Sequence, residues 1–217
     1  MKRRVGVLVS GRGSNLGALI RAAADPAYPA AIALVLSNRP EAPALALAAA
    51  AGIATATIPH RDFASREEFD AAVEARLTAE AIELVCLAGF MRIFSAGFAT
   101  RWQGRILNIH PSLLPAFKGL HPHRQALEAG VRISGCTVHF VTPELDAGPI
   151  VAQAAVPVLP QDDEAALAQR VLAAEHRCYP VALALVARGL ARLEGGRTVF
   201  AAGLPETGLE PRFGCAI

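Results

Sequence analysis

Near its start the chain reads Val5-Gly6-Val7-Leu8-Val9-Ser10-Gly11-Arg12-Gly13-Ser14-Asn15-Leu16. The apolar, β-branched part predicts a buried strand, and residues 15–24 predict the helix that follows it. Glycines let a backbone approach a ligand closely, and a helix N-terminus offers free N–H groups to an anion, so a phosphate fits this turn. The spacing is neither GxGxxG, because the third glycine falls one residue late at Gly17, nor a P-loop. An ordinary turn with Ser14 as a helix cap is the alternative interpretation.

Strand and helix patterns alternate through the first half of the chain. Apolar runs at 32–36, 53–58, 82–87 and 106–109 predict further strands, and residues 44–51 and 66–78 predict helices between them. Ser65 and an acid three residues on have the form of a capping box that begins the second of these helices. This alternation is typical of a parallel sheet with crossover helices. The predicted strands 136–141 and 150–158 have only a loop between them, which favours antiparallel pairing. A helix over 162–188, with Pro180 as a candidate interruption, and a hairpin over 190–200 complete the pattern.

The sequence therefore predicts a protein of the α/β class. We expect a Rossmann-like, mostly parallel twisted sheet with flanking helices, antiparallel strands added in the C-terminal half, and a terminal hairpin. Residues 1–200 are predicted to form a single domain, followed by a loosely packed tail over 201–217.

Composition and charge exclude several classes of protein. Hydrophobic residues make up 53% and charged residues 18%, so a disordered chain is excluded. The net charge of +2 does not imply a nucleic-acid partner, and the chain lacks an apolar run long enough to predict a membrane span. The basic start is followed by too short an apolar run for a secretory signal. Four widely separated cysteines are predicted to be free thiols of a cytoplasmic protein: Cys86, Cys136, Cys178 and Cys215.

An amide and an imidazole lie two residues apart in residues 108–115 (NIHPSLLP). Alternate side chains of a strand share a face, so Asn108 and His110 should point the same way where Pro111 ends the pairing. An amide N–H can hold a carbonyl oxygen and an imidazole can move a proton, which together indicate acyl-transfer chemistry. A carboxylate near His110, such as Asp146, would favour the imidazolium, although spacing alone does not show that Asp146 reaches it. His121 and His123 lack companion ligands, and we predict no metal site.

Two further segments allow a structural or a functional interpretation. Residues 88–94 (AGFMRIF) follow a predicted strand, at the end where open α/β sheets bind ligands, but taken alone they favour core packing with a surface arginine. Residues 174–180 (AEHRCYP) look like a polar helix face, from which Glu175 could instead meet an amine or hydroxyl group of a ligand.

Five motifs, in order, resemble those of the phosphoribosylglycinamide formyltransferase family, within the formyltransferase superfamily. They are residues 10–16 (SGRGSNL), 87–93 (LAGFMRI), 108–115 (NIHPSLLP), 135–141 (GCTVHFV) and 145–150 (LDAGPI). The resemblance covers about residues 4–200. The sequence departs from the family at Phe117, where tyrosine is common, and at Pro122, where threonine is common. Both departures lie in the loop after the catalytic strand, so they bear on loop hydrogen bonding.

The resemblance implies an activity and a set of site residues. The family transfers a formyl group from 10-formyltetrahydrofolate to the glycyl amine of 5'-phosphoribosylglycinamide in purine (IMP) synthesis, without a metal. By motif, Asn108, His110 and Asp146 match its catalytic residues. The remaining matches are Gly13, Ser14, Asn15 and Glu175 toward the ribonucleotide and its phosphate, and Arg66, Met91, Arg92, Ile93, Phe94 and Asn108 toward the folate.

Several alternatives stay open or are disfavoured. A formyltetrahydrofolate hydrolase, or another 10-formyltetrahydrofolate-dependent formyltransferase, is the nearest alternative. A methionyl-tRNA formyltransferase would need a further C-terminal domain, and a nicotinamide-dependent oxidoreductase is disfavoured by the missing GxGxxG. A nucleotide-binding module without catalysis would leave Asn108, His110 and Asp146 without a role. The expected partners are small-molecule substrates, with no nucleic acid and no membrane. The oligomeric state, a homodimer included, stays open.

Overall fold

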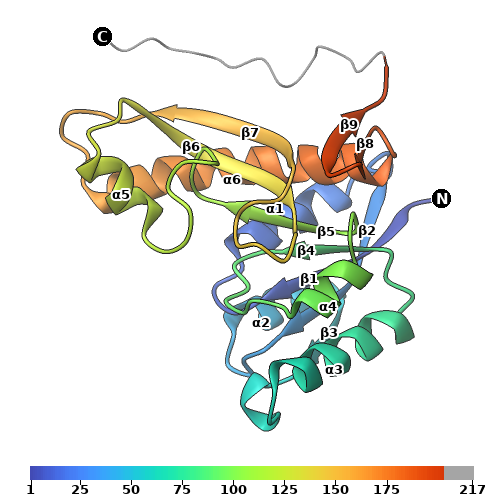
Figure 1. The fold of residues 1–217 in the computed structure, drawn as a ribbon. Coiled ribbons are helices and arrows are strands. Elements are labelled where there is room, and N and C mark those ends of the chain that lie inside the picture. The colour runs from blue at the N-terminus through green and yellow to red at the C-terminus, as the bar shows by residue number, and fades with distance from the viewer. Residues whose placement is uncertain (203–217) are drawn as a thin grey trace.

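A seven-stranded sheet forms the centre of the molecule in a computed structural model that describes residues 1–202 (Figure 1). Its spatial order is β3-β2-β1-β4-β5-β6-β7. The strands are β1 (Arg3–Val9), β2 (Ala30–Ser37), β3 (Ala54–Thr57), β4 (Leu84–Leu87), β5 (Ile106–His110), β6 (Ile133–Phe140) and β7 (Ile150–Pro157).

Strands β1 to β5 pair in parallel, whereas β6 pairs antiparallel with both β5 and β7. This arrangement confirms the predicted fold class, including the antiparallel addition in the C-terminal half. The order reverses at β1, which has β2 and β4 as neighbours. Ligands of open α/β sheets bind outside the carboxyl ends of strands near such a switch point. The turn after β1 and the loop after β4 therefore emerge side by side at that edge.

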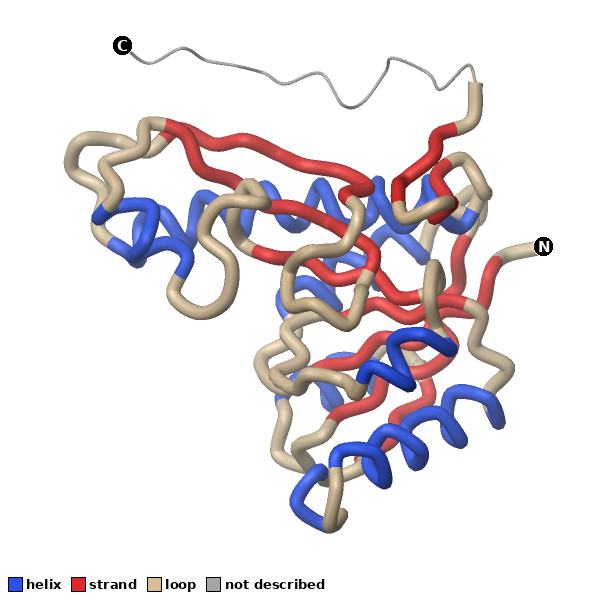
Figure 2. Tube along the Cα trace, in the orientation of Figure 1, coloured by secondary structure: helices blue, strands red, loops and turns tan. Residues whose placement is uncertain are grey.

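Helices cover both faces of the sheet (Figures 1 and 2). They are α1 (Ser14–Ala23), α2 (Pro43–Ala50), α3 (Arg66–Ala79), α4 (Ala96–Arg101), α5 (Pro122–Glu128) and α6 (Glu164–Ala187), with a short 3₁₀ turn η1 at His60–Asp62. Alternate strand residues build the two cores, as β1 illustrates. Val7 packs in the core shared with α1, α2 and α6, and Leu8 in the core shared with α3 and α4.

The predicted helix ends are partly confirmed. Ser65 caps α3, since its Oγ accepts a hydrogen bond from the Glu68 N–H at 3.1 Å. Ser14, in contrast, is not a helix cap: Gly13 holds the N-cap position with φ +82°, and Ser14 is the first residue of α1. A positive φ costs glycine little, which explains why the turn ends on this residue.

Pro180 does not interrupt the last helix, so that part of the prediction was wrong. Helix α6 runs without a break from Glu164 to Ala187, and the Pro180 carbonyl accepts a hydrogen bond from the Tyr28 hydroxyl at 2.6 Å. Proline removes one helical N–H but not the apolar face of the helix. Burial of Leu167, Val171 and Leu183 in the core keeps the axis continuous despite the lost bond.

The terminal hairpin is confirmed as β8 (Ala191–Glu194) and β9 (Arg197–Phe200), a two-stranded sheet of its own. Most of the predicted tail, residues 203–217 with Cys215, lies outside the described residues. The other three cysteines are free and buried. No helix within residues 1–202 combines the length and apolarity needed to cross a membrane. Cytoplasmic location stays a prediction.

Candidate active site

The end of β5 places Asn108 and His110 on one face of the sheet, because both follow Ile106 at alternate positions. The antiparallel neighbour β6 sets Asn108 opposite His139 and His110 opposite Thr137. Side chains directly opposite each other in such a pair lie close enough to interact. The predicted position of Asn108 and His110 on one face of a strand is therefore confirmed. His139 and Thr137 of β6 lie directly opposite them.

Asp146 reaches this cluster from the loop between β6 and β7. Its Oδ2 lies 3.3 Å from Nδ1 of His110, and its Oδ1 lies 3.8 Å from Nε2 of His139. The Asp146 backbone has φ +48°, and the Gly119 N–H donates a hydrogen bond to Oδ2 at 3.0 Å. His110 and Asp146 are both buried, so water screens their attraction poorly. The approach left open by sequence spacing is thus present in the fold.

The second ring nitrogen of His110 is also engaged. Its Nε2 donates a hydrogen bond to the Phe117 carbonyl oxygen at 2.9 Å. A carbonyl and a carboxylate can only accept, so each ring nitrogen of His110 faces a hydrogen-bond acceptor. Phe117 has φ +55°, which places this carbonyl through an unusual backbone conformation.

His139 was not singled out in the sequence, although it lies in the motif 135–141. Its Nδ1 donates to the Phe140 carbonyl at 2.9 Å, and its Nε2 lies 3.2 Å from the Asn108 amide nitrogen. Burial lowers the pKa of His139, which favours the neutral ring. The sequence signal for His139 was its position two residues after Thr137 on a predicted strand, which places both side chains on the same face.

The turn after β1 brings a different pair together. The Asn15 amide donates a hydrogen bond to the Glu175 carboxylate at 2.7 Å, joining the start of α1 to α6. Both side chains are buried, and burial raises the pKa of Glu175 while the Asn15 bond opposes that rise. The Asn15 Oδ1 is buried and has no hydrogen-bond partner within residues 1–202. Gly13 is buried in the same turn and Ser14 is exposed.

The loop after β4 exposes Met91, Arg92 and Ile93, with Met91 66% and Ile93 52% exposed. Exposed apolar side chains of this size are candidates for contact with a flat ligand. Phe94 differs, because its ring is buried and stacks 4.1 Å from the ring of Phe98. Aromatic packing draws the Phe94 ring into the core, and the assignment of Phe94 to the folate side stays a prediction.

Ser10 ties this loop to the turn after β1, a link that the sequence did not reveal. The Ser10 hydroxyl accepts from the Met91 N–H at 2.8 Å and donates to the Asn38 side chain at 2.6 Å. Arg66, at the start of α3, is exposed, and the structure gives no hydrogen bond or ion pair between its side chain and the other predicted site residues.

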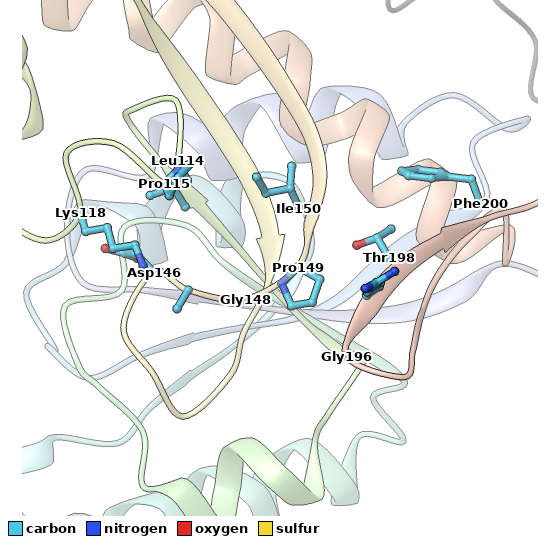
Figure 3. A pocket seen from close by; sticks show the side chains of 12 residues that line it. Leu114, Pro115, Lys118, Asp146, Gly148, Pro149, Ile150, Gly196, Thr198 and Phe200 are labelled. Carbon is cyan, nitrogen blue, oxygen red and sulfur yellow. The ribbon is translucent and has the colours of Figure 1, made fainter.

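A cavity of about 450 Å³ opens beside the cluster (Figure 3). Asp146 and Lys118 lie at one end of it and Thr198 and Phe200 of the terminal hairpin at the other. Among the described residues that line it, Asp146 is the one site residue that the sequence predicted. Within residues 1–202 no group of three or more His, Cys, Asp or Glu side chains is placed to hold a metal.

A mostly parallel α/β sheet that gathers an amide, an imidazole and a carboxylate at the end of one strand is an arrangement suited to acyl-group transfer. The chain belongs to the formyl transferase family, whose model, described as formyl transferase, matches residues 3–183. The resemblance found in the five motifs is confirmed.

Known relatives agree with this placement. The chain is 47% identical over 183 residues to the phosphoribosylglycinamide formyltransferase of Escherichia coli (strain K12), covering 84% of this chain and 86% of the relative. It is 54% identical over 192 residues to the trifunctional purine biosynthetic protein adenosine-3 of Drosophila melanogaster, covering 88% of this chain. This chain spans only 14% of that larger relative. The crystal structure of glycinamide ribonucleotide transformylase 1 from Symbiobacterium toebii matches with a TM-score of 0.89 at 48% identity, covering 92% of this chain and 94% of that one.

Proposed function

We propose that this protein transfers the formyl group of 10-formyltetrahydrofolate to the glycinamide amine of 5'-phosphoribosylglycinamide, a step of purine synthesis. The observation that carries the proposal is the contact of His110 with Asp146 on the strand that also holds Asn108. Membership of the formyl transferase family and the names of the relatives support the same reaction.

The ribonucleotide is assigned to the turn after β1. Gly13, Ser14 and Asn15 present the N-terminal N–H groups of α1 to its phosphate, since a helix N-terminus favours an anion. Glu175 and the buried, unpartnered Oδ1 of Asn15 are assigned to hydroxyl and amide groups of the sugar and glycinamide. The buried pair matches such groups because hydrogen bonds made away from water discriminate strongly.

The formylfolate is assigned to the neighbouring loop. Met91, Arg92 and Ile93 supply exposed apolar surface and backbone groups, Phe94 supplies backbone only, and Asn108 contacts the formyl end. Arg66 is assigned to the folate side through a charge that carries no ion pair in the described part of the chain. The hydrogen bond from Met91 to Ser10 holds the two substrate sites beside each other.

The chemistry is a direct transfer. The amine nitrogen attacks the formyl carbon, its lone pair forms the new C–N bond, and the carbonyl electrons move to oxygen. Asn108 and the imidazolium of His110 donate hydrogen bonds to that oxyanion. As the tetrahedral centre collapses, the carbonyl re-forms and the bond to the folate nitrogen breaks. His110 gives its Nε2 proton to that nitrogen and then takes up the proton that the amine loses, while Asp146 keeps the ring oriented. The scheme needs neither a metal nor a covalent enzyme intermediate.

The His110 Nε2–H must change partners during this cycle. It donates to the Phe117 carbonyl in the structure, and it must turn to substrate oxygen for the oxyanion to be stabilised. The loop that carries Phe117 has to yield this hydrogen bond when the substrates bind.

An absorbance assay of formylfolate consumption, run with and without phosphoribosylglycinamide, tests the proposal. We expect consumption only when the amine is present, with stoichiometric formylated product. Consumption at an equal rate without the amine would overturn the proposal and favour a hydrolase.

A further inference from the structure

Asn108 and His139 form a direct cross-strand pair between β5 and β6. The register of β6 against β7 shifts between Val138 and His139. Such irregularities re-aim a side chain and are frequent beside active sites. The direct pairing of the two residues across β5 and β6 brings the His139 ring to the Asn108 amide, with 3.2 Å between the two nitrogens.

The hydrogen-bond partners of His139 allow a single tautomer. The Phe140 carbonyl, 2.9 Å from Nδ1, can only accept, so Nδ1 carries the proton. The neutral ring then leaves a lone pair on Nε2, and the Asn108 amide must turn an N–H toward it. Burial lowers the pKa of His139 and keeps this neutral form, although Asp146 acts in the opposite direction.

Close packing fixes the Phe140 carbonyl in turn. A Cβ on Gly148 would lie 1.7 Å from the Phe140 oxygen and 3.3 Å from the His139 Nδ1. The β6–β7 loop thus presses on this carbonyl, and the Phe140 N–H donates to the Pro149 carbonyl at 2.9 Å. The N–H of the peptide that carries this carbonyl, that of Val141, donates to the Ile106 carbonyl at 3.0 Å, so the acceptor that sets the His139 tautomer is held in place.

We infer that His139 is a positioning residue that acts through Asn108, and this inference rests on the proposed formyl transfer. An amide side chain has two orientations that differ by exchange of oxygen and nitrogen. One orientation offers an N–H to the formyl oxygen, and the other can offer the amide oxygen, which would repel a developing oxyanion. The lone pair of His139 selects the first by accepting one N–H, which leaves the second N–H of the same amide for the substrate.

The inference is tested with His139→Leu and His139→Gln, each alone and combined with Asn108→Ala. Leucine fills volume without an acceptor, whereas glutamine can place a neutral oxygen near the position of Nε2. We expect His139→Leu to lower kcat about tenfold or more, with KM for both substrates little changed. Glutamine should restore most of kcat. In the Asn108→Ala background the leucine change should have almost no further effect, since residues that act as a unit are not additive.

His60→Leu is the matched control. The His60 Nδ1 also lies 3.2 Å from an asparagine amide nitrogen, that of Asn38, away from the Asn–His–Asp cluster. We expect its kcat to stay within about twofold of the unaltered protein, because its amide faces no oxyanion. If His139→Leu lowers kcat by the same factor with and without the Asn108 side chain, the inference is overturned. A His139→Gln variant as slow as His139→Leu would also overturn it.

Nitrogen NMR of the unaltered protein provides a readout that needs no variant to fold. The His139 Nε2 should resonate as an unprotonated, pyridine-like nitrogen at neutral pH and Nδ1 as a protonated one. A protonated Nε2 would overturn the inference. If the unaltered protein shows no amine-dependent transfer, the proposed function fails, whereas the tautomer measurement still reports on the Asn108–His139 contact.

Discussion

His110 directs Nδ1 toward the carboxylate of Asp146 at 3.3 Å, although one residue ends β5 and the other belongs to the loop between β6 and β7. The carboxylate has a second function, because it accepts the Gly119 N–H at 3.0 Å. One side chain thus orients the imidazole and anchors the loop whose Phe117 carbonyl holds the other ring nitrogen. Ring orientation and loop position are coupled through Asp146.

The substitution Asp146→Asn should lower kcat with little change in the KM for the ribonucleotide. The amide removes the negative charge that pairs with the His110 ring and orients it, while its size keeps the loop in place. Steady-state kinetics across neutral pH measure the effect, which we expect to be about a hundredfold. Glu144→Gln, an exposed acid of the same loop, serves as the control. Turnover of Asp146→Asn equal to that of the unaltered protein would remove Asp146 from the mechanism.

Asn108→Ala should slow the chemical step more than it weakens folate binding. Loss of one oxyanion donor costs roughly 3–4 kcal/mol of barrier, or about a hundredfold to a thousandfold in kcat. Single-turnover rates give the chemical step, and fluorescence titration gives the folate dissociation constant. A variant with weakened folate binding and an unaltered single-turnover rate would contradict the oxyanion assignment.

Gly148→Ala should destabilise the fold and slow the enzyme together. Its Cβ would lie 1.7 Å from the Phe140 oxygen, a backbone atom that has no room to withdraw. Overpacking of this kind costs about 1–3 kcal/mol of unfolding free energy. Gly17→Ala in α1 is the matched control: its Cβ meets side-chain atoms at 3.4 Å or more, and alanine favours a helix. Thermal unfolding of both variants measures the contrast, and equal midpoints would show that the loop relaxes freely.

Glu175→Gln should raise stability at neutral pH while weakening ribonucleotide binding. Burial raises the pKa of Glu175 in the folded protein, so the folded protein holds this proton more tightly than the unfolded chain does. The resulting stabilisation is fully present below the ordinary pKa of 4.5. That contribution is lost as pH rises through the raised value. Glutamine carries no charge to desolvate and can still accept from Asn15.

Chemical denaturation at about pH 4 and about pH 8 measures this difference. The stability advantage of Glu175→Gln should be larger at the higher pH, and an advantage that is constant with pH would refute the explanation. Glu128→Gln, an exposed acid of α5, should change stability equally at both values.

Local sequence predicted most of the sheet and the helices between its strands. Apolar runs such as residues 5–9 and the capping serine at Ser65 carry their own signal, because period and cap are properties of neighbouring residues. The short helices α4 and α5 were not predicted, since six and seven residues give too little periodicity. The predicted interruption at Pro180 was wrong because the local effect of proline was outweighed by burial of the whole helix face.

The sequence by itself determined the α/β class and the shared face of Asn108 and His110, because alternation along a strand needs no tertiary information. The motifs also indicated the family to which the chain belongs. The tertiary structure alone decided that Asp146 meets His110, that His139 faces Asn108 and that Phe94 turns into the core. These contacts join segments far apart in the chain, and they depend on strand register, on the register shift between β6 and β7, and on close packing at Gly148. Each arises from how separate elements pack, which residues adjacent in sequence do not specify.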